Sequence, residues 1–457
     1  MKIGLIRCPA FGPQWAPLNL ALLASYLRQN KYEAQCFDFN IDLYDSASPE
    51  KRKEYWSMSN HHFWDNPDMN ELINDEIIDG WVKKTIDAKI DIVGMSTYSS
   101  NYQITLIYIK KLIAIAPHIK VICGGPFCRT DHGTAQELLN TGIPSAVTVG
   151  EGEDTLLELL DVYRDTGEFK AIPGVLIKNE KGEIEEGGPR TAIKIRETEI
   201  YPDFEGFEFH KYDGHAVPIL SSRSCIYNCA FCNERTYWGT YRSRDAKQVF
   251  TEMQSQALAN NRTEFVFCDL AINGDLKMLD ELCDLILASG IDYKWRGYML
   301  IRKMPRDLIL KMGEAGFLQH CVGIETASPA MLKKMNKNFK ISMAEEMLKN
   351  LYDAGIETHT SWIVGYPGET HEHFMETVDF VKRNKKYMKR VNPANVLNIP
   401  PGSPIAINPE KYGVTEIIDS LHWSDGVTSP EEREERAKYF NDMFCADEFR
   451  TFEKVKF

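Results

Sequence analysis

Three cysteines, Cys225, Cys229 and Cys232, stand in the spacing CxxxCxxC. Cysteine thiolates hold iron–sulfur clusters, and a cubane cluster contains four irons. Three thiolates would leave one iron able to bind a small molecule and pass it an electron. A structural zinc site would need a fourth ligand, and no His or Cys follows at zinc-finger spacing. Two other interpretations stay open: such a zinc site, and cysteines that belong to the core.

These thiols follow a short apolar run at residues 217–220, which predicts a β-strand. They therefore lie on the loop at the C-terminal end of that strand, where α/β barrels carry their chemistry. Strand and helix patterns alternate about six times in this part of the chain, which predicts a partial (β/α)6 TIM-like barrel. The strands are expected at residues 217–220, 263–269, 293–301, 319–324, 358–364 and 394–399.

Polar or glycine-rich residues follow these strands. Asp269 comes after the second expected strand, Arg302 after the third and Glu325 after the fourth. Each of these residues alone does not indicate a functional site, since a charged side chain on a loop is usually just solvated. Because they come at successive strand ends, we expect them to gather at one mouth of the barrel. An aromatic and basic stretch, residues 236–242, is either a packed loop or a wall of that mouth.

The first part of the chain has its own alternation of strands and helices. Strands are expected at residues 2–6, 34–38, 90–96, 121–125 and 146–149. This pattern predicts an α/β fold with a doubly wound, Rossmann-like parallel sheet whose ligand lies beyond the C-terminal strand ends. The glycines at 124, 125, 150 and 152 fall there and would let the backbone approach a ligand, although paired glycines are also common in tight turns.

We therefore expect four regions. Residues 1–170 form the first domain, 171–215 a hairpin and linker, 216–402 the barrel and 403–457 a helical C-terminal region. A polar and aromatic insertion is expected at residues 40–87. Ser429 and Pro430 are a favourable start for a helix in the tail. That helix is expected to pack on the barrel wall, with a lid over the barrel mouth as the alternative.

The composition of the chain limits which kinds of partner we expect it to bind. The 457 residues carry 66 acidic and 53 basic side chains, a net charge of −13, with no basic stripe that would favour nucleic acid. No apolar run approaches the ~20 residues that cross a bilayer. The first residues are typical of a strand, not of a signal peptide, and the eleven scattered cysteines fit a reduced cytoplasm. We expect a cytoplasmic protein that binds neither membrane nor nucleic acid.

The CxxxCxxC motif with Phe231 before its third cysteine resembles the cluster motif of the radical S-adenosylmethionine (SAM) superfamily. In that family SAM chelates the open iron of a [4Fe-4S] cluster, and one electron splits SAM to give a 5′-deoxyadenosyl radical. The stretches Gly323-Ile-Glu-Thr and Gly365-Tyr-Pro-Gly-Glu-Thr look like ones found in radical SAM proteins that carry a cobalamin domain.

This resemblance implies roles for the barrel residues. Cys225, Cys229 and Cys232 would ligate the cluster and serve the catalysis. Phe231 would lie along the adenine of SAM, Glu325 at its ribose or methionine part, and Ile363 with Gly365 over the adenine. The family's Gly-Gly-Glu after the second strand is replaced by Phe267-Cys-Asp269. We therefore expect Asp269, in place of that motif, to contact the amino group of SAM. Arg302 is a further residue that we expect to bind a cofactor.

Residues 1–165 resemble the cobalamin-binding domain that precedes many radical SAM domains, from Pro17-Leu-Asn-Leu-Ala to Gly150-Glu-Gly-Glu-Asp-Thr. The likeness implies that cobalamin is lined by Ser96, Thr97, Gly124, Gly125, Gly150, Glu151 and Gly152. The DxHxxG motif that supplies a histidine to cobalt is absent, and Arg7-Cys-Pro-Ala-Phe-Gly-Pro follows the first strand instead. We expect no histidine on the cobalt; a domain that has lost cobalamin and serves as a scaffold is the alternative.

Together the resemblances imply a cobalamin-dependent radical SAM enzyme, a methyltransferase that adds methyl to an unactivated carbon through the 5′-deoxyadenosyl radical and methylcobalamin. The alternatives are a radical SAM cyclase or rearrangement enzyme in which cobalamin is not the methyl donor, and a cobalamin- or redox-responsive binding protein. The expected partners are a small-molecule or peptide substrate and an external electron donor of the flavodoxin or ferredoxin type.

Overall fold

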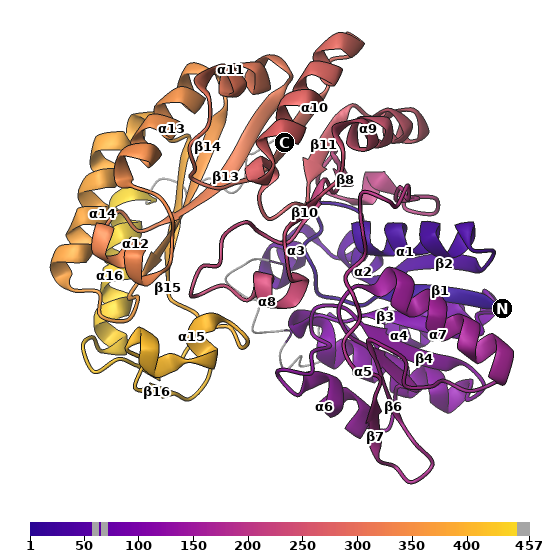
Figure 1. Cartoon of the computed structure of the whole chain (residues 1–457). Helices are drawn as coiled ribbons and strands as arrows, with labels where there is room; N and C mark the ends of the chain where they lie inside the picture. Colours follow the sequence, from indigo (N-terminus) through magenta and orange to yellow (C-terminus); the bar gives the residue numbers. More distant parts are fainter. Residues whose placement is uncertain (57–63, 65–71, 446–457) are drawn as a thin grey trace. The chain divides into compact units, whose positions relative to one another are not determined.

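The computed structural model describes residues 1–56, 64 and 72–445, which form two compact units (Figure 1). The first unit contains residues 1–194 and 198–215. The second contains residues 195–197 and the chain from Ala216 onward. Among the described residues, no helix is long and apolar enough to cross a membrane.

The first unit is built on a seven-stranded sheet in the order β2-β1-β3-β4-β5-β6-β7. Strands β1 to β5 are parallel, and β6 and β7 continue the sheet in antiparallel fashion. The predicted doubly wound parallel sheet is therefore confirmed. The hairpin expected in the linker is β6–β7, which pairs with β5 and belongs to the sheet. The strands are β1 (Lys2–Arg7), β2 (Glu33–Asp38), β3 (Ile92–Ser96), β4 (Lys120–Gly124), β5 (Ala146–Thr148), β6 (Val175–Lys178) and β7 (Ile184–Glu186).

Helices cover both faces of this sheet, because its strands are apolar on both sides. One face packs against α1 (Leu18–Gln29) and α7 (Gly152–Thr166), and the other against α4 (Asp75–Asp87), α5 (Tyr102–Ile115) and α6 (Thr134–Asn140). The insertion expected at residues 40–87 contains α2 (Phe39–Ser46), α3 (Pro49–Tyr55) and α4, while its residues 57–63 and 65–71 lie outside the described residues.

The second unit is built on six parallel strands in the order β15-β14-β13-β12-β11-β8, which confirms the predicted partial barrel. Figure 1 shows helices along the outside of this curved sheet. The strands are β8 (Val217–Ile219), β11 (Glu264–Phe267), β12 (Lys294–Met299), β13 (Phe317–Glu325), β14 (Glu357–Val364) and β15 (Arg390–Val396). The helices are α9 (Ala246–Asn260), α10 (Leu276–Ser289), α11 (Arg306–Glu314), α12 (Pro329–Lys334), α13 (Ile341–Asp353) and α14 (His371–Asn384).

The burial pattern of the strands separates the two sides of this sheet. In β14, Thr358, Thr360, Trp362 and Val364 are buried, while the side chains between them are half-buried or exposed. Successive side chains of a strand point to opposite faces. The buried set packs on the helices, and the half-buried set therefore faces the hollow side of the sheet.

The C-terminal tail packs against the outer side of the barrel strands. Helix α16 (Pro430–Phe444) starts at the predicted cap, where the Glu432 amide donates to the Ser429 hydroxyl at 3.2 Å. Its Phe440 ring lies 5.7 Å from that of Trp362 in β14, and Asn441 bonds the backbone of Ala394 in β15. The helix thus packs on the wall as expected, and this packing does not support the lid. Phe449, one of the aromatic residues that suggested a lid, lies outside the described residues.

Candidate cluster and cofactor sites

The three cysteines of the CxxxCxxC motif lie on the loop that follows β8 and the short strand β9 (Ser222–Arg223), and all three thiols are free and half-buried. The pKa of Cys229 is raised to about 12, mainly by burial and to a smaller extent by the nearby Cys232 and Cys225. The positive charge of Lys337 lowers the pKa of Cys225 and of Cys229. Thiols that raise one another's pKa become thiolates when they bind a cationic metal centre. The trio therefore fits an iron–sulfur cluster.

The side-chain positions alone do not separate the cluster from the zinc alternative, because the three cysteines themselves are not gathered around one point. Within residues 1–56, 64 and 72–445, no group of three or more His, Cys, Asp or Glu side chains is placed to hold a single metal ion. A tetrahedral zinc site would bring four ligands around one ion. Three thiols without a fourth protein ligand are the donor set of a cubane whose fourth iron is open to another molecule.

Asp269 positions the start of the cluster loop. Its buried carboxylate accepts hydrogen bonds from the Ser221 amide at 3.0 Å and the Ser221 hydroxyl at 2.7 Å, and also from the Ser222 hydroxyl. Burial raises its pKa. Because the carboxylate is turned toward this strand end, the arrangement does not support the expected contact to the amino group of SAM.

The Arg302 side chain likewise binds backbone carbonyls. Its guanidinium donates to the carbonyls of Asn273 and Gly274, at 2.7 and 2.8 Å. These carbonyls belong to the turn that follows β11. In this structure Arg302 therefore positions the turn after β11, and its expected role in cofactor binding stays a prediction.

Residues that the sequence reasoning missed also hold the cluster loop. Arg235, on α8 (Glu234–Trp238), donates to the carbonyls of Cys225 and Ile226 at 3.2 and 3.3 Å. Tyr227 donates its hydroxyl to the carbonyl of Ile301 at 2.9 Å. The aromatic and basic stretch at residues 236–242 follows Arg235 directly, and its residues are half-buried or exposed. Both interpretations of this stretch, a packed loop and a wall of the barrel mouth, stay predictions.

Replacing Arg235 with alanine is expected to loosen the cluster loop. Hydrogen bonds from a charged donor contribute about 1.5–3 kcal/mol each, so loss of this pair should speed iron loss from the reconstituted protein about tenfold or more. The measurement is the rate at which a chelator removes iron under anaerobic conditions. Arg242→Ala is the matched control, because Arg242 donates to the carbonyls of Trp238 and Thr240, outside the cluster loop. Equal rates for both variants would contradict this role of Arg235.

An ion pair lies beside the cysteines. The Lys337 ammonium is 3.1 Å from the Glu325 carboxylate and also donates to the Gly323 carbonyl. Their side chains are only 3% and 13% exposed. Glu325 ends β13 with a φ of +67°, and a Cβ on Gly323 would lie 2.0 Å from its carboxylate. The chain thus needs glycine at position 323 to fold this carboxylate back toward the cluster loop.

Phe231 joins this group from the cluster loop itself. The Lys337 ammonium lies 5.9 Å from the centre of the Phe231 ring, within reach of a cation–π contact. The structure therefore brings Phe231, Glu325 and the cysteines together, as the sequence predicted. Lys337, which the sequence reasoning missed, stands between them.

An apolar wall extends from Phe231. Phe231 and Ile363 both pack against a cluster of buried residues from the α12 segment, from the loops after β14 and β15, and from the tail: Met331, Met335, Tyr366, Leu397, Ile399, Ile405, Val414 and Trp423. Gly365 has a φ of +69°, and a Cβ there would meet Arg433 of α16 at 2.6 Å. The roles of Ile363 and Gly365 toward adenine stay predictions, and the wall offers the apolar surface that an adenine ring would need.

The hollow face of the sheet is polar. Cys321 lies 3.4 Å from the Ser361 hydroxyl, and Asn392 donates to the Cys321 sulfur at 3.7 Å. Nearer the N-terminal strand ends, the Gln319 amide lies 2.7 Å from an imidazole nitrogen of His359. The pKa of His359 is lowered to about 4, mainly by burial and also by the nearby positive charge of Arg390.

This depressed pKa predicts a pH dependence of stability. In the unfolded chain His359 takes up a proton near its ordinary pKa of 6.5. In the folded chain it takes up that proton only near pH 4. The contribution of neutral His359 is therefore complete above pH 6.5 and is lost as the pH falls toward 4. Urea unfolding at pH 7, 6 and 5 should show a steeper loss of stability in the unaltered chain than in His359→Gln. Parallel losses would contradict the prediction.

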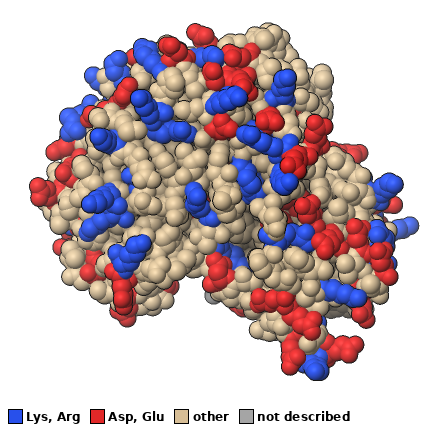
Figure 2. Space-filling model, viewed as in Figure 1, with Lys and Arg blue, Asp and Glu red and all other residues tan. Residues whose placement is uncertain are grey.

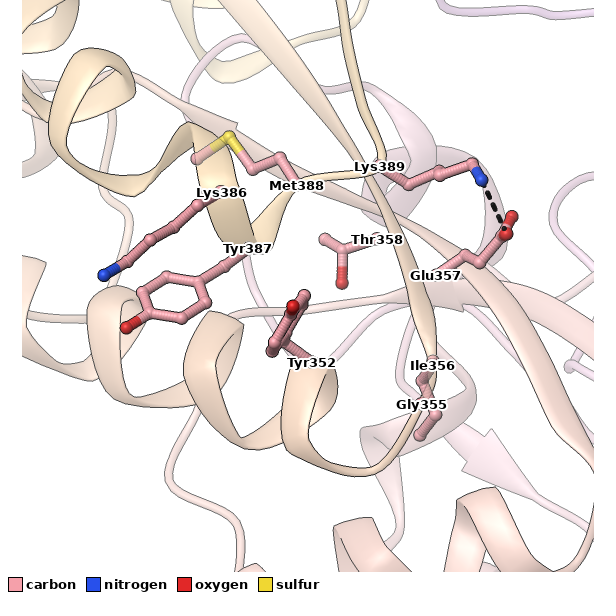
Figure 3. Close-up of a pocket in the computed structure, with 9 residues that line it drawn as sticks. All are labelled: Tyr352, Gly355, Ile356, Glu357, Thr358, Lys386, Tyr387, Met388 and Lys389. Atoms are coloured by element: carbon pink, nitrogen blue, oxygen red, sulfur yellow. Dashed lines mark ion pairs between the residues drawn. The ribbon is translucent and has the colours of Figure 1, made fainter.

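A pocket of about 320 Å³ lies at the opposite end of the barrel (Figure 3). Its lining comes from the starts of β14 and β15, and Glu357 and Lys389 form an ion pair at its rim, 3.2 Å apart. Barrel enzymes carry their chemistry at the C-terminal strand ends. This pocket is therefore distinct from the candidate site.

In the first unit, the residues expected to line cobalamin lie at the C-terminal ends of β3, β4 and β5. Gly125 has a φ of +105°, and a Cβ there would lie 2.8 Å from the Thr97 carbonyl, so the packing of the chain itself requires this glycine. The Ser96 hydroxyl accepts from the Asn19 amide at 2.8 Å. Gly124 ends β4, and a Cβ there would meet the Thr148 hydroxyl at 2.4 Å.

The β5–α7 connection supplies the other residues of this set. Gly150 has a φ of +82° and open space around its Cβ position. Glu151 accepts from the Ile193 amide at 2.7 Å, and Gly152 begins α7. Among the glycines of this set, Gly150 alone has no heavy atom within 4 Å of its Cβ position. Direct contacts of these residues with cobalamin stay predictions.

Two protein families match this chain. Residues 219–381 match the radical SAM superfamily, and residues 65–160 match the B12 binding domain. The chain carries a B12-binding domain followed by a radical SAM domain. The predicted resemblance is confirmed, and with it the predicted cofactors, a [4Fe-4S] cluster and SAM for one domain and cobalamin for the other.

Curated relatives of this chain include an uncharacterized methyltransferase of Pyrococcus horikoshii, 28% identical over 300 residues, which are 64% of this chain and 64% of the relative. An anaerobic magnesium-protoporphyrin IX monomethyl ester cyclase of Rubrivivax gelatinosus is 26% identical over 79% of this chain and 61% of the relative. The matched region thus spans less than two thirds of either relative.

Solved structures show the same fold. The cobalamin-dependent SAM radical enzyme OxsB, with aqua-cobalamin and SAM bound, has a TM-score of 0.68 and 17% identity over 90% of this chain and 56% of its own. The radical SAM methyltransferase TsrM from Kitasatospora setae, with tryptophan substrate and a SAM analogue bound, has a TM-score of 0.70 and 18% identity over 97% of this chain and 83% of its own.

Proposed function

We propose that this protein is a cobalamin-dependent radical SAM enzyme that adds a methyl group to an unactivated carbon of a small-molecule or peptide substrate. One observation carries the proposal. The three cysteines of the cluster loop stand beside the Glu325–Lys337 pair, in a chain that also carries a B12-binding domain. A protein that only binds cobalamin would have no use for a cluster with an open corner.

The cofactors, when bound, would supply a 5′-deoxyadenosyl radical and a transferable methyl group. The protein binds and orients them. Cys225, Cys229 and Cys232 would hold the cluster, and the buried Lys337 offsets the negative charge of the Cys225 and Cys229 thiolates. The apolar wall around Phe231 and Ile363 keeps water from the place where the radical forms.

Two kinds of relative favour different outcomes for the radical. The Pyrococcus horikoshii relative is named a methyltransferase, and the Rubrivivax gelatinosus relative is named a cyclase. The alternative function is therefore a radical SAM cyclase or rearrangement enzyme in which cobalamin is not a methyl donor.

Labelled SAM separates the two without knowledge of the substrate. The reconstituted protein is incubated with cobalamin, a chemical reductant and SAM that carries a trideuterated methyl group. A methyltransferase should give labelled methylcobalamin and S-adenosylhomocysteine, and also 5′-deoxyadenosine. 5′-Deoxyadenosine without labelled methylcobalamin would favour the cyclase. Neither product from protein with about four irons per chain would overturn both proposals.

A further inference from the structure

We propose that exposed lysines next to the cluster loop form the docking surface for an acidic one-electron carrier protein of the flavodoxin or ferredoxin type. This lysine surface consists of Lys333, Lys334 and Lys340, all exposed. The inference rests on the proposed function, because radical SAM chemistry needs an electron from outside the chain.

The sequence sets this segment apart. Residues 326–344 contain four lysines and no aspartate or glutamate, in a chain whose net charge is −13. An acidic partner would be repelled by the chain as a whole and attracted to such a local patch, since charges within about 10 Å act most strongly at ordinary salt. Figure 2 shows lysine or arginine side chains over the region where Figure 1 places α12.

This segment lies directly on the cluster loop. The Ala230 amide donates to the Met335 carbonyl at 2.9 Å, and the Asn336 side chain donates to the Asn228 carbonyl at 2.6 Å. Asn228 precedes Cys229 in the chain. An electron that arrives at Asn336 is therefore one hydrogen bond and a few covalent bonds away from a cluster ligand.

The fourth lysine of the segment points the other way. Lys337 is buried against Glu325, whereas its neighbours in the lysine surface point to solvent. One short segment thus presents positive charge both to the cluster loop and to an approaching partner. Two nearby carboxylates, Asp425 and Glu369, do not cancel this charge, because they are buried and paired with the arginines of α16. Glu345, five positions after Lys340, pairs with Arg383 at 3.4 Å, and the exposed Glu346 follows it.

The transfer changes no bonds. The reduced carrier loses one electron, and the site held by the three cysteines gains it; where the carrier is a flavoprotein, any proton released by its flavin goes to solvent. Charge complementarity of this kind acts mainly on the rate of encounter and gives it a steep dependence on salt.

Charge reversal tests the surface. Holoprotein carrying Lys333→Glu and Lys340→Glu is mixed with reduced flavodoxin in a stopped-flow instrument, and reduction of the cluster is followed by its absorbance. We expect the rate at low salt to fall about tenfold or more, and to lose most of its salt dependence. Lys334 is left unchanged because its ammonium also lies 3.5 Å from the Gly368 carbonyl, beside the expected adenine loop.

Lys382→Glu with Lys386→Glu is the matched control. Both lysines are exposed and lie at the end of α14 and just after it, and their reversal changes the net charge equally. This control should keep the rate of the unaltered protein. Equal slowing of both variants would overturn the docking surface, and so would unchanged rates in both.

Dithionite separates this proposal from the proposed function. As a small reductant it needs no docking surface, so both variants should be reduced by it at the rate of the unaltered protein. Slower reduction of the Lys333/Lys340 variant by dithionite would also overturn the docking surface, because the lysines would then act on the cluster itself. If dithionite reduces the unaltered protein but no 5′-deoxyadenosine forms, the proposed function fails while the docking result stands.

Discussion

Replacing Cys229 with alanine is expected to abolish formation of 5′-deoxyadenosine, with a loss greater than about a thousandfold. A cluster left with two protein thiolates has two unligated irons, and it is then easily lost or converted to a smaller cluster. Cys229 is also the thiol that lies between its two partners in the motif and close to Lys337. The measurements are iron content and absorbance after anaerobic reconstitution, followed by product analysis with SAM and dithionite.

Cys283→Ala is the matched control for this result. Cys283 is a buried cysteine of α10 in the same unit, outside the cluster loop. Its replacement removes a thiol from the core, so it should cost some stability and leave iron content unchanged. Full iron content and undiminished 5′-deoxyadenosine in Cys229→Ala would contradict the assignment of the cluster to this loop. Equal iron loss in both variants would show a general effect of removing thiols.

Local patterns in the sequence were enough to predict the strands, the helices and the cluster loop. The order of the strands in either sheet was not predicted, because right-handed crossovers fix the hand of each connection and not which strands become neighbours. The place of Phe231 and Glu325 near the cysteines could be predicted, since successive parallel strands end at one mouth. Phe231 and Glu325 are separated by over ninety positions, and their proximity is confirmed.

Side-chain direction at a strand end was beyond this reasoning. Asp269 and Arg302 lie at the expected strand ends, yet both are turned to backbone groups of neighbouring loops. Which way such a residue turns depends on hydrogen-bond donors and acceptors that come from distant parts of the chain. Lys337 was missed for a related reason: it follows Glu325 by twelve positions, across the short helix α12, so no periodicity joins the two.

Replacing Lys337 with methionine is expected to weaken SAM binding and lower the 5′-deoxyadenosine rate by about a hundredfold or more. Removal of one partner from a buried ion pair costs about 3–5 kcal/mol, because the other charge stays buried without compensation. Here the Glu325 carboxylate would lose its 3.1 Å partner, and Cys225 and Cys229 would lose the buried cation that lowers their pKa. The measurements are the Kd for SAM, by equilibrium dialysis of the reconstituted protein, and the rate of 5′-deoxyadenosine formation with dithionite.

Two further variants show whether the charge or the packing of Lys337 matters. Lys337→Arg keeps the positive charge and should recover much of the SAM affinity, although its larger head group must fit the space near Gly323 and Phe231. Combining Lys337→Met with Glu325→Gln removes both charges and should cost less than the two single losses together, because the residues form one pair. Additive losses, with no recovery by arginine, would contradict a direct electrostatic role. Lys337 would then be a packing residue of the α12 segment, and the pair beside the cluster would have no part in holding SAM.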